Sequence, residues 1–150
     1  EPLVRLRKDG VRKVAAALGL PEEAWNRPPF PGPALAARVI GEATRERVDL
    51  IRRATAIVEA ELAPVATNAF QFLAILHEDR VTGMQDGQRQ FGQQIEIRCW
   101  DSVDAREATP TELPWPVLRR VADRLTSEVP GVVSVTYNLA TKPPSTIEAV

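Results

Sequence analysis

The chain has little of the chemistry that many enzymes depend on: its 150 residues include one cysteine, Cys99, and one histidine, His77. A single cysteine excludes an internal disulfide and any multi-cysteine zinc site. A Ser-His-Asp triad or a poly-histidine metal site would have to include His77. No apolar run approaches the roughly 20 residues that cross a bilayer, and the N-terminal stretch EPLVRLRKDG has no continuous apolar segment. We therefore expect no membrane association and a cytoplasmic location.

An excess of positive charge is also lacking. The chain has 19 basic and 20 acidic residues, for a formal net charge of −1. This balance does not provide the basic surface that binds a nucleic-acid backbone, and the expected strands lack a row of exposed aromatic residues for RNA bases. Hydrophobic residues make up 44% of the chain, which is enough for a packed core. We expect no nucleic-acid partner.

The common catalytic and phosphate-binding motifs are missing. The sequence contains no GxxxxGK[ST], GxGxxG, SGG, HExxH or CxxC segment. The neighbouring acids Glu22-Glu23 and Glu78-Asp79 are interpreted as solvated charges, because adjacent side chains point apart. For His77 we favour a surface or edge position over a general base, and for Cys99 an inert core thiol. We expect no catalytic residue, no metal site and no cofactor within this chain.

Helical spacing of apolar residues predicts two long helices. The first is capped by Thr44 and ends near Pro64, and its apolar stripe is Val48, Ile51, Thr55, Val58 and Leu62. The second begins between Pro114 and Pro116 and stops at Pro130-Gly131, and its apolar face is Leu118, Val121, Ala122, Leu125 and Val129. A shorter helix is expected from a cap at Asp9 to Gly19, and a helical turn after Pro21.

Four segments have the character of strands: residues 35–40, 69–76, 91–99 and 133–139. The third alternates clearly, with Phe91, Gln93, Ile95, Ile97 and Cys99 on one face, which predicts a half-buried strand. Asp86-Gly87 is a turn signal, and residues 101–113 are polar and loop-like. The order of elements predicts an α+β fold, a two-layer sandwich in which a small, mostly antiparallel sheet is backed by helices.

Two segments suggest a binding role. RPPFPGPALAAR, from Arg27 to Arg38, is a stiff proline-rich loop between two arginines that suits an anionic ligand, and a simple connector is the alternative. In KPPSTIE, from Lys142 to Glu148, an ammonium, two hydroxyls and the N–H groups at 146–148 could converge on a phosphate. A mobile terminus is the alternative for this second segment.

The order of four motifs resembles the C-terminal part of bacterial GMP synthetase, the glutamine-hydrolysing GMP synthase. The motifs are EPLVRLRKDGVRKVAAALGLP, RPPFPGPALAARVIGE, MQDGQR and EVPGVVSVTYNLATKPPSTIE, and they extend over nearly the whole chain. The resemblance implies that residues 1–25 are the end of an ATP-pyrophosphatase domain and that residues 26–150 are a dimerisation domain. It also implies a homodimer formed through the sheet, and upstream ATP-pyrophosphatase and glutamine amidotransferase domains.

In that family, ATP adenylates xanthosine monophosphate (XMP) and ammonia then displaces AMP to give GMP. The resemblance implies that the substrate-binding residues here are Arg27, Phe30, Pro31, Gly32, Pro33, Arg38, Lys142, Thr146, Ile147 and Glu148. The resemblance places Arg27 and the loop from Phe30 to Pro33 against the nucleotide. It places the four named residues from Lys142 to Glu148 at the phosphate and ribose. ATP and Mg²⁺ belong mainly to the preceding domain of the full enzyme, so this chain alone is not expected to be active.

Several positions depart from the family pattern. Pro28 replaces a histidine, Ala34 a glycine and Gln85 a glycine, and Gln88 and Arg89 stand where one arginine is expected. The family commonly ends IEWE, whereas here Ile147-Glu148 is followed by Ala149-Val150. These changes support an alternative: a non-catalytic dimerisation or nucleotide-sensing paralogue that has lost XMP amination. The expected partner under the main interpretation is XMP or a related purine nucleotide, and the alternative keeps the fold but has lost the substrate.

Overall fold

The chain divides into two compact units, residues Glu1–Phe30 and Pro31–Val150. The computed structural model describes residues 3–25, 34–85 and 87–149. The first unit contains α1 (Lys8–Ala17) and α2 (Glu22–Trp25), and α2 is the helical turn predicted after Pro21. Gly19 follows the end of α1 with a φ of 73°, a conformation that glycine adopts at little cost. The predicted stop of the first helix is therefore confirmed.

The predicted cap at Asp9 is wrong. The N-cap residue of α1 is Arg7, whose side chain makes no capping hydrogen bond. Asp9 lies one step inside the helix, in the first turn. A carboxylate there still interacts favourably with the positive end of the helix dipole, which explains why an acidic residue occurs near this helix start without capping it.

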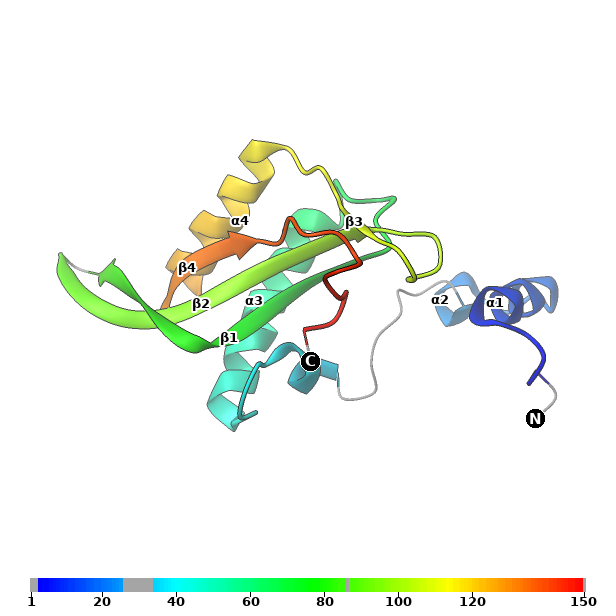
Figure 1. Cartoon of the computed structure of the whole chain (residues 1–150), viewed down its shortest axis with the longest axis horizontal. Coiled ribbons are helices and arrows are strands. Elements are labelled where there is room, and N and C mark those ends of the chain that lie inside the picture. Colours follow the sequence, from blue (N-terminus) through cyan, green and yellow to red (C-terminus); the bar gives the residue numbers. More distant parts are fainter. Residues whose placement is uncertain (1–2, 26–33, 86, 150) are drawn as a thin grey trace. The chain divides into compact units, whose positions relative to one another are not determined.

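The described part of the second unit is an open mixed sheet of four strands with two long helices on one face (Figure 1). The helices are α3 (Arg45–Leu62) and α4 (Trp115–Glu128), and the strands are β1 (Gln71–Gln85), β2 (Gln88–Asp101), β3 (Thr109–Pro110) and β4 (Val132–Tyr137). The central strand β2 pairs antiparallel with β1 and β3 and parallel with β4. The predicted two-layer α+β fold is confirmed. No helix in the described ranges combines the length and apolar character needed to cross a bilayer.

Both long helices lie where the apolar spacing predicts them. Thr44 caps α3 by accepting a hydrogen bond from the Arg47 N–H at 3.3 Å. The buried residues of α3 are Ile51, Ala54, Thr55, Ile57, Val58 and Leu62. Those of α4 are Val117, Val121 and Leu125, while the predicted Leu118 and Ala122 are half-buried. The apolar face of α4 is therefore rotated slightly from the predicted one.

The segment 35–40, predicted as a strand, is mostly helical. It forms the short 3₁₀ helix η1 (Ala34–Arg38), and only Val39 pairs with β1, through an isolated bridge to Leu76. The physical reason is composition. The alanines in this stretch favour helical conformations, and the β-branched residues that favour strands occur only at its end.

The β1–β2 hairpin is longer than predicted. Gln85 pairs with Gln88, and Gly87, with a φ of 76°, lies in the turn; Asp86 lies outside the described residues. In Figure 1 the far end of this hairpin extends past α3 and α4. Phe91, predicted on the buried face, lies on this extension with 67% of its surface exposed. The helices do not cover this half of β1, so residues 77–85 are mostly polar. They therefore lack the apolar pattern from which a strand could be predicted.

A valine on β4 lies against glycines of both hairpin strands. A Cβ on Gly83 would be 2.5 Å from Cβ of Val133, and a Cβ on Gly92 would be 2.5 Å from Cγ1 of the same residue. The β2–β4 pairing is irregular at this point, since Gln93 pairs with Val132 and Gln94 with Ser134. The missing side chains at the two glycines leave the space that Val133 fills.

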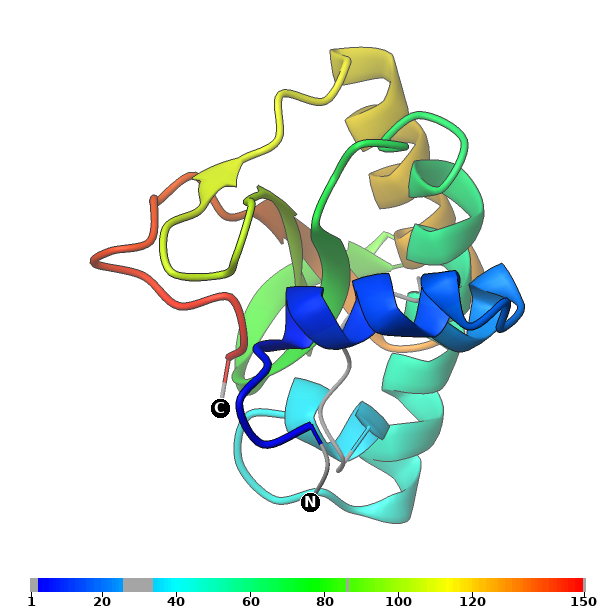
Figure 2. The same ribbon diagram turned by 90° about the vertical axis from the view of Figure 1, so that its right-hand side faces the viewer.

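The centre of β2 is covered on both faces. Ile95, Ile97 and Cys99 join the core formed with α3 and α4. On the opposite face Trp100 is fully buried, and Glu96 and Arg98 are 7% and 9% exposed. The prediction of a half-buried strand is therefore wrong for this stretch. Figure 2 shows why: the helices lie on one side of the sheet, and the C-terminal segment, drawn in red, lies on the other.

Candidate functional site

The C-terminal segment 138–149 is fastened to the sheet face that the helices leave open, and we call it the tail. Lys142 and Ala108 exchange backbone hydrogen bonds of 3.0 and 2.8 Å. Beyond this bridge, Ile147 is 4% exposed and packs in a small cluster with Trp100 and Ala108. The tail thus has its own apolar anchor, separate from the core under the helices.

One guanidinium holds the end of the tail. Nη1 of Arg98 donates to three consecutive backbone carbonyls, those of Thr146 at 2.9 Å, Ile147 at 3.3 Å and Glu148 at 3.2 Å. Nε of Arg98 donates to Oε1 of Glu96 at 2.6 Å. An arginine with this many partners is strongly oriented, because its planar donors are satisfied in fixed directions.

Glu96 collects donors from three different segments. Its carboxylate accepts hydrogen bonds from Arg98, from the Asn138 side-chain amide at 2.8 Å, and lies 2.7 Å from Nε2 of His77. Burial by itself would raise the pKa of Glu96, but the hydrogen bonds from Arg98, Asn138 and His77 outweigh it, so the pKa is lowered. The carboxylate is therefore ionised at neutral pH and balances the Arg98 charge.

The ammonium of Lys142 is directed toward a turn of the neighbouring loop. Nζ donates to the carbonyl of Ala105 at 2.6 Å. Ala105 has a φ of 65°, which is uncommon for a residue with a side chain, and it packs against the cluster around Trp100. An ammonium has three donors, so this contact leaves Lys142 the capacity to bind an anion as well.

Glu148 is half-buried and Arg38 is buried, and the side chain of each is bonded to a residue outside the tail. Oε1 of Glu148 accepts from the Gln71 amide at 3.4 Å, and Oε2 is buried with no hydrogen-bond partner among the described residues. Arg38 is 2% exposed and donates to Oγ1 of Thr55 at 3.1 Å. Burial lowers the pKa of Arg38, and the negative charges of Glu59 and Glu148 act in the opposite direction. Arg38 therefore lies within electrostatic reach of the tail.

The structure describes half of the residues predicted to bind substrate. Lys142, Thr146, Ile147 and Glu148 lie on the tail, next to Arg98 and the Trp100 cluster. Arg38 lies in η1 and is bonded to Thr55 of α3, and its connection with Glu148 is electrostatic. The hydroxyl of Thr146 donates to the carbonyl of Glu148 at 2.6 Å. The other predicted residues lie outside the described residues: Arg27, Phe30, Pro31, Gly32 and Pro33.

Sequence reasoning missed Arg98 and Glu96. The alternation in residues 91–99 leaves both on the face opposite Ile95 and Ile97, where charged residues of a half-buried strand are ordinarily solvated. A signal was present, because opposite charges two residues apart share one face of a strand, and Trp100 continues that face. A large aromatic residue beside an acid–base pair indicates that something covers the face.

Three other interpretations from sequence can be compared with the structure. Cys99 is buried and its thiol pKa is raised chiefly by burial, which confirms an inert core thiol. Glu22, Glu23, Glu78 and Asp79 are exposed, as expected for solvated charges. His77 is half-buried on β1, an edge strand of the described sheet, and its Nε2 lies 2.7 Å from Oε2 of Glu96, which fits the expected edge position.

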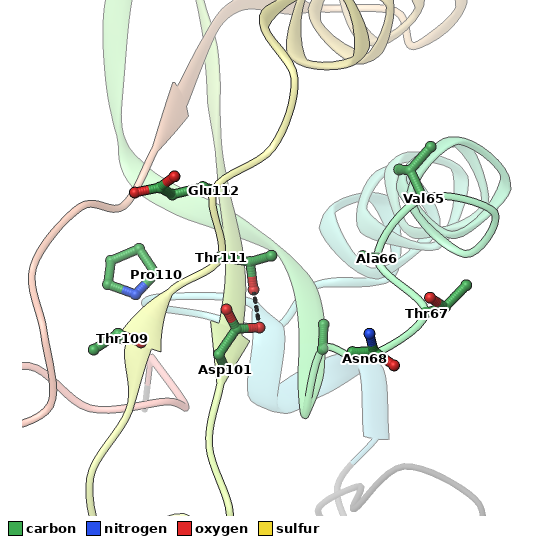
Figure 3. Close-up of a pocket in the computed structure, with 10 residues that line it drawn as sticks. Val65, Ala66, Thr67, Asn68, Asp101, Thr109, Pro110, Thr111 and Glu112 are labelled. Carbon is green, nitrogen blue, oxygen red and sulfur yellow. Dashed lines mark hydrogen bonds between the residues drawn. The ribbon is translucent and has the colours of Figure 1, made fainter.

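A cavity of about 520 Å³ lies on the other side of β3 from the tail's anchor, between residues 65–69 and residues 109–112 (Figure 3). Asp101 lines it and accepts a hydrogen bond from the Thr111 hydroxyl at 2.7 Å. The charged residues lining it are Asp101 and Glu112, both acidic. Two carboxylates disfavour a phosphate, and none of the five described residues predicted to bind substrate lines this cavity.

The fold and the tail define a class: a small two-layer α+β domain with basic residues at a fastened C-terminal segment. Residues 58–149 match the family described as GMP synthase C terminal domain. This match covers more than half of the chain, and the chain belongs to that family.

Named relatives agree with this assignment. The chain is 45% identical over 150 residues to a glutamine-hydrolyzing GMP synthase subunit of Methanothermobacter thermautotrophicus, covering 99% of this chain and 49% of that protein. It is 47% identical over 148 residues to the corresponding GMP synthase subunit of Pyrococcus furiosus, covering 99% and 47%. It is 47% identical over 150 residues to the glutamine-hydrolyzing GMP synthase of Aeropyrum pernix, covering 99% and 29%. The chain thus spans about half the length, or less, of these relatives.

Proposed function

We propose that this chain is the C-terminal part of a GMP synthase and that its tail holds the phosphate of XMP while the complete enzyme aminates the base. The observation that supports the proposal is the grouping of Lys142, Thr146, Ile147 and Glu148 around Arg98 and the Trp100 cluster. Arg38 adds positive charge within electrostatic reach of Glu148. The residues to which the proposal gives the binding role are held by hydrogen bonds and apolar packing, which supports it.

The remaining parts of the reaction are proposed for other parts of the enzyme. ATP and Mg²⁺ would bind mainly to an ATP-pyrophosphatase domain, of which residues 1–25 would be the end, and ammonia would come from a glutamine amidotransferase. Lys142 and the tail would orient XMP rather than act on the reacting atoms, and such orientation contributes to rate by fixing the reacting geometry. The reaction class is a ligase of purine biosynthesis.

Calorimetric titration of the chain with XMP tests the proposal. We expect saturable binding, and we expect Lys142→Met to weaken it roughly 10- to 100-fold, because a charge-assisted hydrogen bond contributes about 1.5–3 kcal/mol. Arg119→Met is the matched control: it removes one positive charge from an exposed side chain of α4, on the opposite side of the sheet. Its affinity should equal that of the unmodified chain.

Two outcomes would contradict the proposal. Absence of binding to XMP by the unmodified chain would favour the alternative of a dimerisation or nucleotide-sensing module that has lost the substrate. Equal affinity of Lys142→Met and the unmodified chain for XMP would contradict a phosphate site at the tail. Repeating the titration at higher ionic strength adds a check, because charge-based phosphate binding weakens with salt.

We further propose that the chain forms a homodimer through its sheet. The outer edge of β1 is paired only at Leu76 within the described residues, and the hairpin end exposes Met84 and Phe91, each 67% exposed. An unpaired strand edge with apolar side chains is a ready partner for a second copy, and a stable dimer would bury on the order of 1,000 Å² or more.

Light scattering after size exclusion measures this directly. We expect twice the chain mass of 16.5 kDa for the unmodified protein. Phe91→Asp should shift the equilibrium toward monomer, because it places a charge on the exposed hairpin end. Val103→Asp is the control, since Val103 is 99% exposed and lies beyond the opposite end of β2. A clean monomer of the unmodified protein at high concentration would contradict the dimer.

A further inference from the structure

Arg98 is not one of the residues expected to bind substrate, yet it holds the end of the tail through three hydrogen bonds. Its Nη1 is the shared donor to the carbonyls of Thr146, Ile147 and Glu148. Its Nε is bonded to Glu96, which is itself held by Asn138 and His77. The guanidinium is thus fixed from behind by the sheet and presents its other end to the tail.

The direction of the carbonyls fixes the direction of the amides. In a trans peptide unit the C=O of one residue and the N–H of the next point in opposite directions. The cis peptide bonds of the described chain precede Pro143 and Pro144, so the units that follow Thr146, Ile147 and Glu148 are trans. With three carbonyls directed at Arg98, the N–H groups of Ile147, Glu148 and Ala149 point away from it.

Within the described part of the chain these amides keep an unused donor each, on residues that are half-buried (Glu148 and Ala149) or 4% exposed (Ile147). None of the three donates a hydrogen bond to another described residue. Successive backbone N–H groups pointing to one side of a loop form a recurrent binding arrangement for anions. The carbonyl oxygens, which would repel a phosphate, are turned toward Arg98 and accept its hydrogen bonds.

We propose that Arg98 is a positioning residue for the anion site: by holding the three carbonyls it orients the tail amides toward the phosphate of XMP. This inference rests on the proposed function and adds a residue to it. The positioning role is carried by Nε and Nη1, which are directed to Glu96 and to the tail carbonyls. Its effect on binding passes through the backbone of residues 146–149.

Backbone ¹⁵N relaxation of the ligand-free chain tests the positioning role without relying on XMP. Ordered amides have order parameters of about 0.85 and flexible ones fall below about 0.6. We expect ordered values for residues 146–149 in the unmodified chain and flexible values in Arg98→Met. XMP affinity should fall roughly 10- to 100-fold in that variant, because binding must then order the tail.

Three further variants distinguish loss of the positioning role from misfolding and from the loss of a positive charge. Arg98→Lys keeps the charge but cannot reach Glu96 and all three carbonyls together, so intermediate order and affinity are expected. Glu96→Gln/Arg98→Met removes both charges at once and leaves no unpaired buried charge; it should loosen the tail as Arg98→Met does. Arg80→Met is the matched control, because Arg80 donates to a single carbonyl, that of Phe91, on the exposed hairpin.

The outcomes separate this inference from the proposed function. Unchanged tail order in both Met variants would overturn the positioning role. Weaker XMP binding by Arg98→Met with an ordered tail would also overturn it and would make Arg98 a direct ligand of the phosphate. If the unmodified chain binds no XMP and the tail is flexible in the Met variants, the positioning role of Arg98 is supported. Only the proposal that XMP is the ligand is then overturned.

Discussion

Replacing Trp100 with alanine is expected to lower the free energy of unfolding by about 3–5 kcal/mol, the usual cost of removing a buried large aromatic side chain. Trp100 is completely buried beneath the tail, where it packs with Ala108 and Ile147. Its loss would leave a cavity and also remove the apolar anchor of the tail. Chemical denaturation of both proteins measures the difference.

Two comparisons make the Trp100 prediction specific. Trp115→Ala removes the same side chain from the start of α4, where it is 70% exposed, and should cost far less. Trp100→Phe should cost less than about 1.5 kcal/mol, because it keeps most of the volume and removes an indole N–H that has no hydrogen-bond partner among the described residues. Similar losses for Trp100→Ala and Trp115→Ala would contradict the packing described here.

Glu96→Gln is expected to destabilise the fold by roughly 2–4 kcal/mol at neutral pH, because it leaves the Arg98 charge buried without its carboxylate. The folded-state pKa of Glu96 lies below the ordinary value of 4.5, since its hydrogen bonds outweigh the effect of burial. The unfolded chain therefore binds this proton more readily than the folded one. The stabilisation is complete above about pH 4.5 and is lost as the pH falls through the lowered pKa.

Denaturation as a function of pH checks this sign. The gap between the unmodified protein and Glu96→Gln should be widest at neutral pH and should close in acid. Glu61→Gln is the control, because Glu61 also binds two arginines, Arg120 and Arg124, but does so near the surface, where ion pairs contribute little. A gap between the unmodified protein and Glu96→Gln that stays constant from neutral pH into acid would contradict the ionised state assigned to Glu96.

Local patterns predict most of the fold. The stripe from Val48 to Leu62 identifies α3, and the alternation from Ile95 to Cys99 with Gly87 in the turn identifies the hairpin. These signals work because one face of each element meets the helix–sheet core. The patterns failed at residues 35–40, where alanine composition favours a 3₁₀ helix, and along the outer half of β1, whose polar residues carry no burial signal.

The candidate site is less accessible to sequence reasoning. Lys142 and residues 146–148 were proposed from the proline-rich motif and the family resemblance. Arg98 could not be found in this way, because its importance depends on a segment almost fifty residues later folding back over the sheet. Charged residues on a strand predict solvent exposure unless a tertiary contact covers them, and that contact is not visible in local spacing.

Arg98 recognises the end of the chain through groups that every amino acid carries. The bonds to Arg98 therefore do not depend on the side chains at positions 146 and 148, which add separate contacts: the Thr146 hydroxyl with the Glu148 carbonyl, and the Glu148 carboxylate with Gln71. Proline would be tolerated least at these positions, because it constrains the backbone angles that aim the carbonyls. The attachment does not depend on the side chain of Ala149 either, because the bonds to Arg98 come from the main chain of Thr146, Ile147 and Glu148.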